Sequence, residues 1–176
     1  GFGIAVATLN LGQIETERGD LTLALEYLAR AHAAAQPLKA RDLLTDIRAA
    51  EARAYAEASL WEDAADAADD ALAAAREIAN PGIEAKALWA QAAVALAKGD
   101  SAASLDNFGK SVEAARGADL KRWEARSLLG RALAAEAVGD AAASSADLAA
   151  AVAAFGDHTP QRDLDGIRAL GERLSS

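Results

Sequence analysis

The stretch Leu9–Ala31 reads LNLGQIETERGDLTLALEYLARA, and it decides the fold. A Gly19-Asp20 pair lies near its centre, with segments rich in Leu and Ala on either side. Glycine readily adopts the left-handed backbone conformation that ends a helix, and aspartate caps the first turn of the helix that follows. The stretch therefore predicts two helices joined by a two-residue turn, which together form a helical hairpin.

The Gly-Asp pair recurs along the chain at a regular spacing. It returns at Gly99-Asp100 and, 40 residues later, at Gly139-Asp140. The same spacing predicts a further turn at 59–60, where the chain reads Ser59-Leu60. Small residues recur with this 40-residue period at three positions of each hairpin: Gly12, Ala52, Ala92 and Ala132; Ala24, Ala64, Ser104 and Ser144; Ala31, Ala71, Ser111 and Ala151. The chain is therefore expected to repeat one hairpin four times.

Helix-breaking residues between the turns place the helix boundaries. Pro37, Asn80-Pro81 and Gly117 interrupt the pattern between successive hairpins, and Thr159-Pro160 opens a last helix. We expect helices over 4–18, 21–35, 39–58, 61–79, 83–97, 101–116, 120–138, 141–154 and 160–174. The repeats then cover 1–38, 39–80, 81–118 and 119–156 of a single domain, and a capping helix lies within 157–176.

The composition favours the same fold class. Alanine accounts for 51 of the 176 residues, whereas the chain has only 3 Phe, 3 Trp and 2 Tyr. Because alanine has the highest helix propensity and a low strand propensity, the chain is expected to be all-α, and a β-sandwich or barrel is excluded. Helices joined by so short a turn must pack closely, which requires Gly, Ala or Ser where they touch. Leucines such as Leu11, Leu88 and Leu128 should fill the layers between stacked hairpins.

The same positions carry a family resemblance. Leu11-Gly12, followed by Gly19-Asp20, Ala24, Leu28 and Ala31, follows the tetratricopeptide-repeat pattern. The resemblance extends over about 1–155 through Ala52, Tyr55, Ala64, Ala71, Ala92, Gly99-Asp100, Phe108, Ala132, Gly139-Asp140, Leu148 and Ala151. The 40-residue period exceeds the family's usual 34 and is similar to the long-hairpin variant of bacterial regulators, including maltose-regulator-like activators, antibiotic-regulator-type activators and nucleotide cyclases. It implies a right-handed α-solenoid of four antiparallel helix hairpins plus a C-terminal capping helix.

The resemblance also implies a ligand groove. In this family the first helix of each repeat lines a concave surface. Among the positions carried over residue by residue, five are candidates for ligand contact: Gln13, Arg53, Lys86, Trp89 and Arg126. Together they would form a cationic groove edged by an aromatic ring, suited to an extended or helical peptide with an acidic group. The competing interpretation is that the basic residues are ordinary solvated side chains and Trp89 belongs to the core.

Several function classes are not expected. A net charge of −9 argues against direct nucleic-acid binding, and no apolar run reaches the roughly 18 residues of a membrane span. The absence of Cys excludes a disulfide framework, and we expect no leader peptide. His32 and His158 have no partner at a metal-binding or catalytic spacing. We therefore expect no enzyme activity, no cofactor and no metal site.

The function expected from the resemblance is that of a scaffold that binds a protein or peptide, with another domain of the same chain as one candidate partner. It would serve as the interaction or sensor module of a cytoplasmic bacterial regulatory protein in signalling or transcription regulation. The alternative is a small-molecule inducer sensor of a transcription activator. Because the chain begins at Gly1 and contains no Met, we expect a fragment of a larger protein. Its uncapped N-terminal end around Gly1-Phe2 is expected to allow weak self-association.

Overall fold

The computed structural model describes residues 1–175, with the side chain of His158 left out of the description. Within that range the chain forms nine α-helices, two short 3-10 turns and no strand. The α-helices are α1 (Phe2–Arg18), α2 (Leu21–Ala35), α3 (Arg41–Glu57), α4 (Trp61–Glu77), α5 (Pro81–Ala97), α6 (Ser101–Gly117), α7 (Lys121–Ala137), α8 (Ala141–Phe155) and α9 (Gln161–Leu174). The fold class expected from the sequence, an all-α solenoid of four hairpins and a closing helix, is confirmed.

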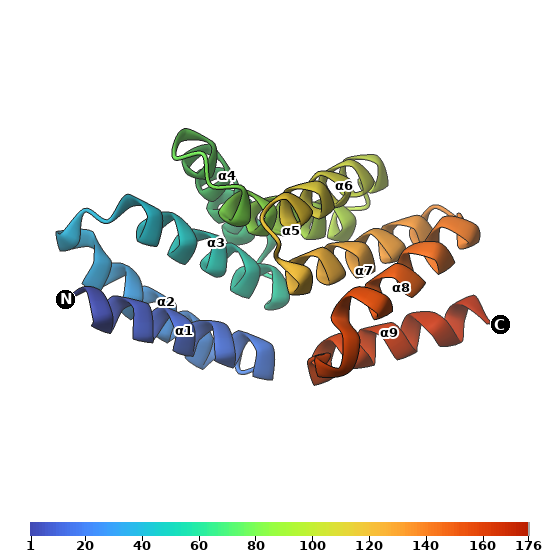
Figure 1. Cartoon of the computed structure of the whole chain (residues 1–176), viewed down its shortest axis with the longest axis horizontal. Helices are drawn as coiled ribbons and strands as arrows, with labels where there is room; N and C mark the ends of the chain where they lie inside the picture. The colour runs from blue at the N-terminus through green and yellow to red at the C-terminus, as the bar shows by residue number, and fades with distance from the viewer. Residues whose placement is uncertain (176) are drawn as a thin grey trace.

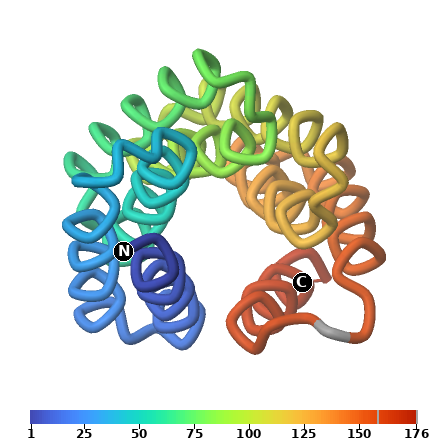
Figure 2. The backbone as a smooth tube through the Cα atoms, turned by 60° about the vertical axis from the view of Figure 1, so that its left-hand side comes forward, coloured from blue at the N-terminus to red at the C-terminus, as the bar shows by residue number. Residues whose placement is uncertain are grey.

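Successive helices pack on one another and curve into an open ring (Figures 1 and 2). The odd-numbered helices also contact one another in order, α1 with α3, α3 with α5, α5 with α7 and α7 with α9. These five helices form the inner layer of the ring, whose two ends, α1 and α9, face each other across the opening (Figure 2). Side chains that point inward from distant repeats therefore meet in a common interior.

The turns have the conformation that the sequence predicts. Gly19, Gly99 and Gly139 end their helices at φ values of 84°, 79° and 79°. The aspartate after each glycine accepts a hydrogen bond from a backbone N–H in the first turn of the next helix, at 3.0–3.2 Å. Ser59 takes the glycine's place in the second hairpin, with φ 59°, at the turn that the period predicts.

The small positions lie where the helices touch, and every one of the twelve is buried. At Gly12 an added Cβ would lie only 2.7 Å from Cγ of Leu28, so no side chain fits. The hydroxyls of Ser104 and Ser144 donate hydrogen bonds to backbone carbonyls of the preceding helix, at 3.0 and 2.8 Å. The alanine-rich composition is thus explained by close helix packing.

Several helix boundaries differ from the expectation by one or two residues, and so does the burial of Leu11. Leu11 is 41% exposed, because no described helix packs on that face of α1. Helix α3 begins at Arg41 and not at 39, after a 3-10 turn over Gln36–Leu38 that ends at Lys39 with φ 52°. Residue 176 of the expected capping helix lies outside the described residues.

Candidate functional site

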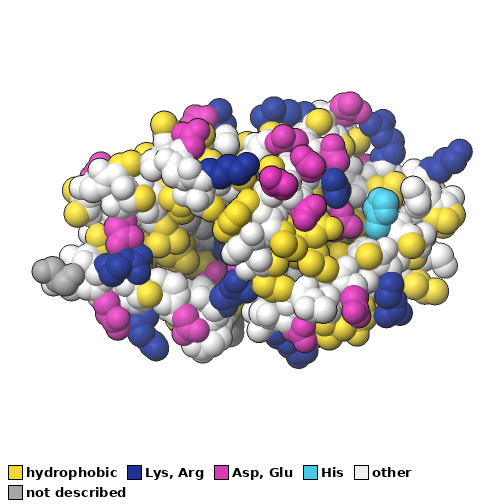
Figure 3. All heavy atoms as spheres, turned by 180° about the vertical axis from the view of Figure 1, so that it is seen from behind, with side chains coloured by type: hydrophobic (Ala, Val, Ile, Leu, Met, Phe, Trp, Pro, Cys, Tyr) yellow, Lys and Arg dark blue, Asp and Glu magenta, His cyan; other side chains and the backbone are white. Residues whose placement is uncertain are grey.

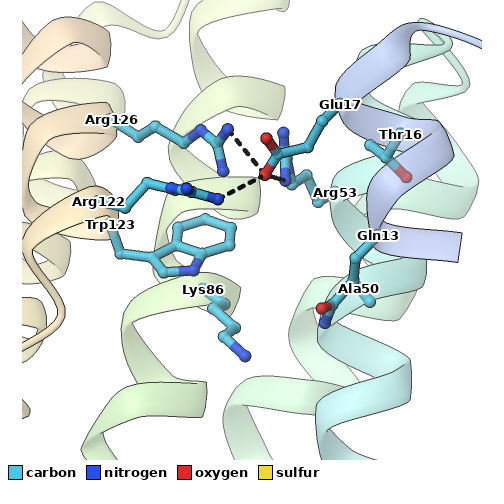
Figure 4. Close-up of a pocket in the computed structure, with 9 residues that line it drawn as sticks. All are labelled: Gln13, Thr16, Glu17, Ala50, Arg53, Lys86, Arg122, Trp123 and Arg126. Carbon is cyan, nitrogen blue, oxygen red and sulfur yellow. Dashed lines mark hydrogen bonds and ion pairs between the residues drawn. The ribbon is translucent and has the colours of Figure 1, made fainter. Parts of the chain in front are cut away.

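The face of the ring seen from behind and the ring interior differ in charge. On the face seen from behind, acidic and basic side chains lie interspersed among hydrophobic ones (Figure 3). The interior instead holds a cavity of about 120 Å³ around which cations predominate. This inner cavity is lined by Gln13, Thr16, Glu17, Ala50, Arg53, Lys86, Arg122, Trp123 and Arg126 (Figure 4).

The inner cavity brings together four of the five residues that the sequence singles out. Gln13, Arg53, Lys86 and Arg126 come from α1, α3, α5 and α7, the first helices of the four hairpins. Trp89 does not line this cavity, but its ring packs edge-on against Trp123 at a centroid distance of 6.1 Å and an interplanar angle of 76°. All five candidates therefore lie in one region of the ring interior.

Glu17 is the centre of the charged contacts. One of its carboxylate oxygens, Oε1, lies 3.1 Å from Arg126 Nη2, 3.5 Å from Arg53 Nη1 and 3.6 Å from Arg122 Nη1 (Figure 4). Burial by itself would raise the pKa of Glu17, but the positive charges of Arg126, Arg53 and Arg122 together hold that pKa below its usual value. Glu17 is therefore ionised at neutral pH.

The closing helix takes part in the same cluster. Asp163 of α9 accepts a hydrogen bond from Arg126 Nη2 at 3.0 Å. Arg162, also of α9, forms an ion pair with Glu57 of α3, and its Nη1 donates to the backbone carbonyl of Thr16 at 3.4 Å. These contacts join α9 to α1, α3 and α7, so the open side of the ring is tied by polar interactions.

Arg53 is the most unusual side chain of the cavity. Only 5% of it is exposed, and both Arg53 and Arg126 place their guanidinium carbon 5.6 Å from the ring centroid of Trp123. Burial, together with the positive charge of Arg126, lowers the pKa of Arg53 to about 10. Its buried Nε has no hydrogen-bond partner, since the nearest carboxylate oxygen, Oε1 of Glu57, lies 3.7 Å away. A buried donor of this kind costs free energy unless something pairs with it.

A second, apolar pocket of about 300 Å³ lies beside Trp89. Its walls come from α3, α4, α5, α6 and α7, and Trp61, Trp89, Phe108 and Leu133 supply the larger apolar side chains. The Trp89–Trp123 contact separates this apolar pocket from the inner cavity. The interior of the ring thus offers a cationic compartment and an apolar compartment side by side.

Sequence reasoning missed several members of the cluster. Trp123 was not among the candidates, yet it lies against two buried arginines. Arg122 and Arg126 are one helical turn apart, a spacing that could have marked them as a pair. Glu17 and Asp163 reach the same cavity only through the curvature of the array, and no local pattern reveals that.

Comparison with known protein families and with curated proteins finds no match. Over residues 1–175, no group of three or more His, Cys, Asp and Glu side chains is arranged to hold a metal ion; the His158 side chain lies outside the described part. No described helix combines the length and apolar character that crossing a membrane requires. The functional argument therefore rests on the geometry of the ring interior.

Proposed function

We propose that this chain is a tetratricopeptide-type binding module whose inner face holds an acidic segment of a protein or peptide. One observation carries the proposal. The chain has a net charge of −9, yet one cavity is lined by four cationic side chains: Arg53, Lys86, Arg122 and Arg126. Glu17 is the one acidic residue among those that line it. Such a concentration of buried and half-buried cations favours a ligand with negative charge.

The composition of the inner face supports recognition of a protein or peptide. Arginine and tryptophan are enriched among the residues that dominate binding energies, and both surround this cavity. Inner surfaces of helical solenoids present side chains from successive repeats to one extended ligand. A segment from another domain of the parent polypeptide is one source of such a ligand. The role in a bacterial cytoplasmic regulator, without catalysis, rests on the repeat resemblance alone.

A second candidate function is a small-molecule sensor. The apolar pocket beside Trp89 favours it, because about 300 Å³ enclosed mainly by apolar side chains can hold a small organic molecule. A thermal-shift screen of metabolites tests this candidate. A stabilising compound should lose its effect in Ala93→Leu, which fills the pocket, and an unchanged shift in that variant would contradict the site.

Titration with an acidic peptide tests the main proposal. Tryptophan fluorescence of the wild-type chain should change saturably with a Glu- and Leu-containing peptide, and not with its Gln counterpart. Arg122→Gln removes a half-exposed cavity arginine, and we expect a roughly fivefold or larger loss of affinity together with a weaker salt dependence.

Lys110→Gln is the matched control for this titration. Lys110 is about as exposed as Arg122 and pairs only locally, with Asp106 on α6. Its replacement removes the same charge from the protein but leaves the inner cavity unchanged. Absence of saturable binding, or equal affinities in the Arg122 and Lys110 variants, would contradict the proposal.

A further inference from the structure

Glu17 lies in the inner cavity as a ligand would. Three arginines from two other helices converge on a single oxygen of its carboxylate. Its own helix does not favour this position, because Glu17 lies in the last turn of α1, where the helix dipole disfavours negative charge. The side chain is still 24% exposed, so it can leave the cavity without unfolding α1.

The charges around Glu17 are not balanced. The ion pairs of this region connect five cations, Arg53, Lys86, Arg122, Arg126 and Arg162, with four carboxylates, Glu17, Asp46, Glu57 and Asp163. We call this set the inner ion cluster. It carries one surplus positive charge with Glu17 in place and two when Glu17 is withdrawn. A dianion therefore matches the vacated site better than a single carboxylate does.

The donors of the cavity also exceed what Glu17 can accept. Arg53 and Arg122 reach Glu17 only at 3.5 and 3.6 Å, so one carboxylate oxygen pairs poorly with their N–H groups. A tetrahedral oxyanion presents several acceptor oxygens in different directions, whereas all three arginines contact the same oxygen of Glu17. The volume of about 120 Å³ is ample, since one water needs roughly 10–15 Å³ on the same measure.

We propose that Arg53, Arg122 and Arg126 form an oxyanion site that binds a phosphate group in exchange for the Glu17 carboxylate. The proposal rests on the proposed function, because it names the anionic group that the inner face recognises. Trp123, packed under two of the arginines, keeps their guanidinium groups in place and shields them from water. Since Glu17 ties α1 to α3 and α7, the exchange also breaks these ion pairs between the first helix and the rest of the ring interior.

Inorganic phosphate is the probe. Glu17→Gln is the test variant, because it removes the negative charge that competes with phosphate for the three arginines. We expect this variant to bind phosphate at least about tenfold more tightly than the wild-type chain. Tryptophan fluorescence measures the binding, at constant ionic strength. Adding Arg122→Gln to it should weaken phosphate binding about fivefold or more. Glu84→Gln, at a carboxylate of similar exposure paired with Arg76 on the surface, is the control and should bind phosphate as the wild-type chain does.

Equal phosphate affinity in wild-type and Glu17→Gln chains would overturn the exchange. Acetate that binds the variant as well as phosphate does would overturn the preference for a dianion. If Glu17→Gln does not fold in anion-free buffer, circular dichroism during phosphate addition decides the matter. Refolding driven by phosphate and not by chloride supports the site, and the absence of refolding contradicts it.

The acidic-peptide titration of the wild-type chain is independent of this experiment. Peptide binding without any phosphate effect would overturn the oxyanion site and leave the proposed function intact. A phosphate site without peptide binding would overturn the proposed function alone.

Discussion

Substituting Gly12 by Ala is the sharpest test of the close helix packing. A Cβ at this position would lie 2.7 and 2.8 Å from Cγ and Cδ2 of Leu28 and 3.2 Å from the carbonyl oxygen of Ala24. Leu28 is fully buried, so it cannot move aside without disturbing the first hairpin. Overpacking of this kind costs about 1–3 kcal/mol, while replacing a mid-helix glycine by alanine returns about 0.5–1 kcal/mol. The net expectation is a loss of stability.

Gly109→Ala supplies the reference for the helix-propensity gain. Gly109 lies in the middle of α6, and the only neighbour near an added Cβ is Nη1 of Arg131 at 3.9 Å. This variant should be about 0.5–1 kcal/mol more stable than the wild-type chain. The difference between the two variants then isolates the steric cost at Gly12, which we expect to be about 1–3 kcal/mol.

Urea unfolding followed by far-UV circular dichroism measures both values, provided that the slope of the free energy with urea is the same in all chains. Helical arrays can unfold repeat by repeat, so tryptophan fluorescence should be recorded in parallel. Trp61, Trp89 and Trp123 lie in the second, third and fourth hairpins and report on regions away from Gly12. If Gly12→Ala stabilises the chain as much as Gly109→Ala, the packing described for the first hairpin is wrong.

Three other predictions concern pH, helix capping and association. Since the pKa of Glu17 is lowered on folding, its stabilising contribution should be full above about pH 5 and disappear as the pH falls through the folded pKa. The free energies of unfolding of wild-type and Glu17→Gln chains, measured with urea, should therefore converge in acid, and a difference that stays constant with pH would contradict this prediction. Asp100→Ala removes the cap on the Ala103 N–H and should cost about 0.5–2 kcal/mol in the same assay, and no change would refute the cap. Ile4 and Ile14 are 65% and 46% exposed on α1, so sedimentation should show weak dimerisation that the double change to Gln removes; monomers at all concentrations would refute it.

The local features of the fold could be predicted from the sequence because they depend on neighbouring residues. The Gly19-Asp20 turn needs only a residue that tolerates positive φ and one that caps a helix. Asn80-Pro81 separates two helices as expected, although α5 begins at Pro81 and not at 83, with the Asn80 side chain accepting from the Ile83 N–H at 3.1 Å. The 40-residue period then located the second turn at Ser59, although no glycine marks it.

The assembly of the inner cavity could be predicted only in part. Lys86 and Arg126 could be identified because they occupy equivalent positions of the first helices, 40 residues apart, and Arg53 because it lies on a first helix. The contact of Glu17 with Arg126 depends on the curvature of the whole ring, which accumulates from small rotations at each repeat. The unpaired Nε of Arg53 likewise results from packing in the interior, and no sequence pattern predicts it.

The most direct measurement of the central claim is a crystal structure of the Glu17→Gln chain with saturating phosphate. The account predicts a phosphate in the inner cavity, with its oxygens within hydrogen-bonding distance of the guanidinium groups of Arg53, Arg122 and Arg126. A cavity that holds no phosphate at a concentration where the ion saturates the chain in solution would contradict it.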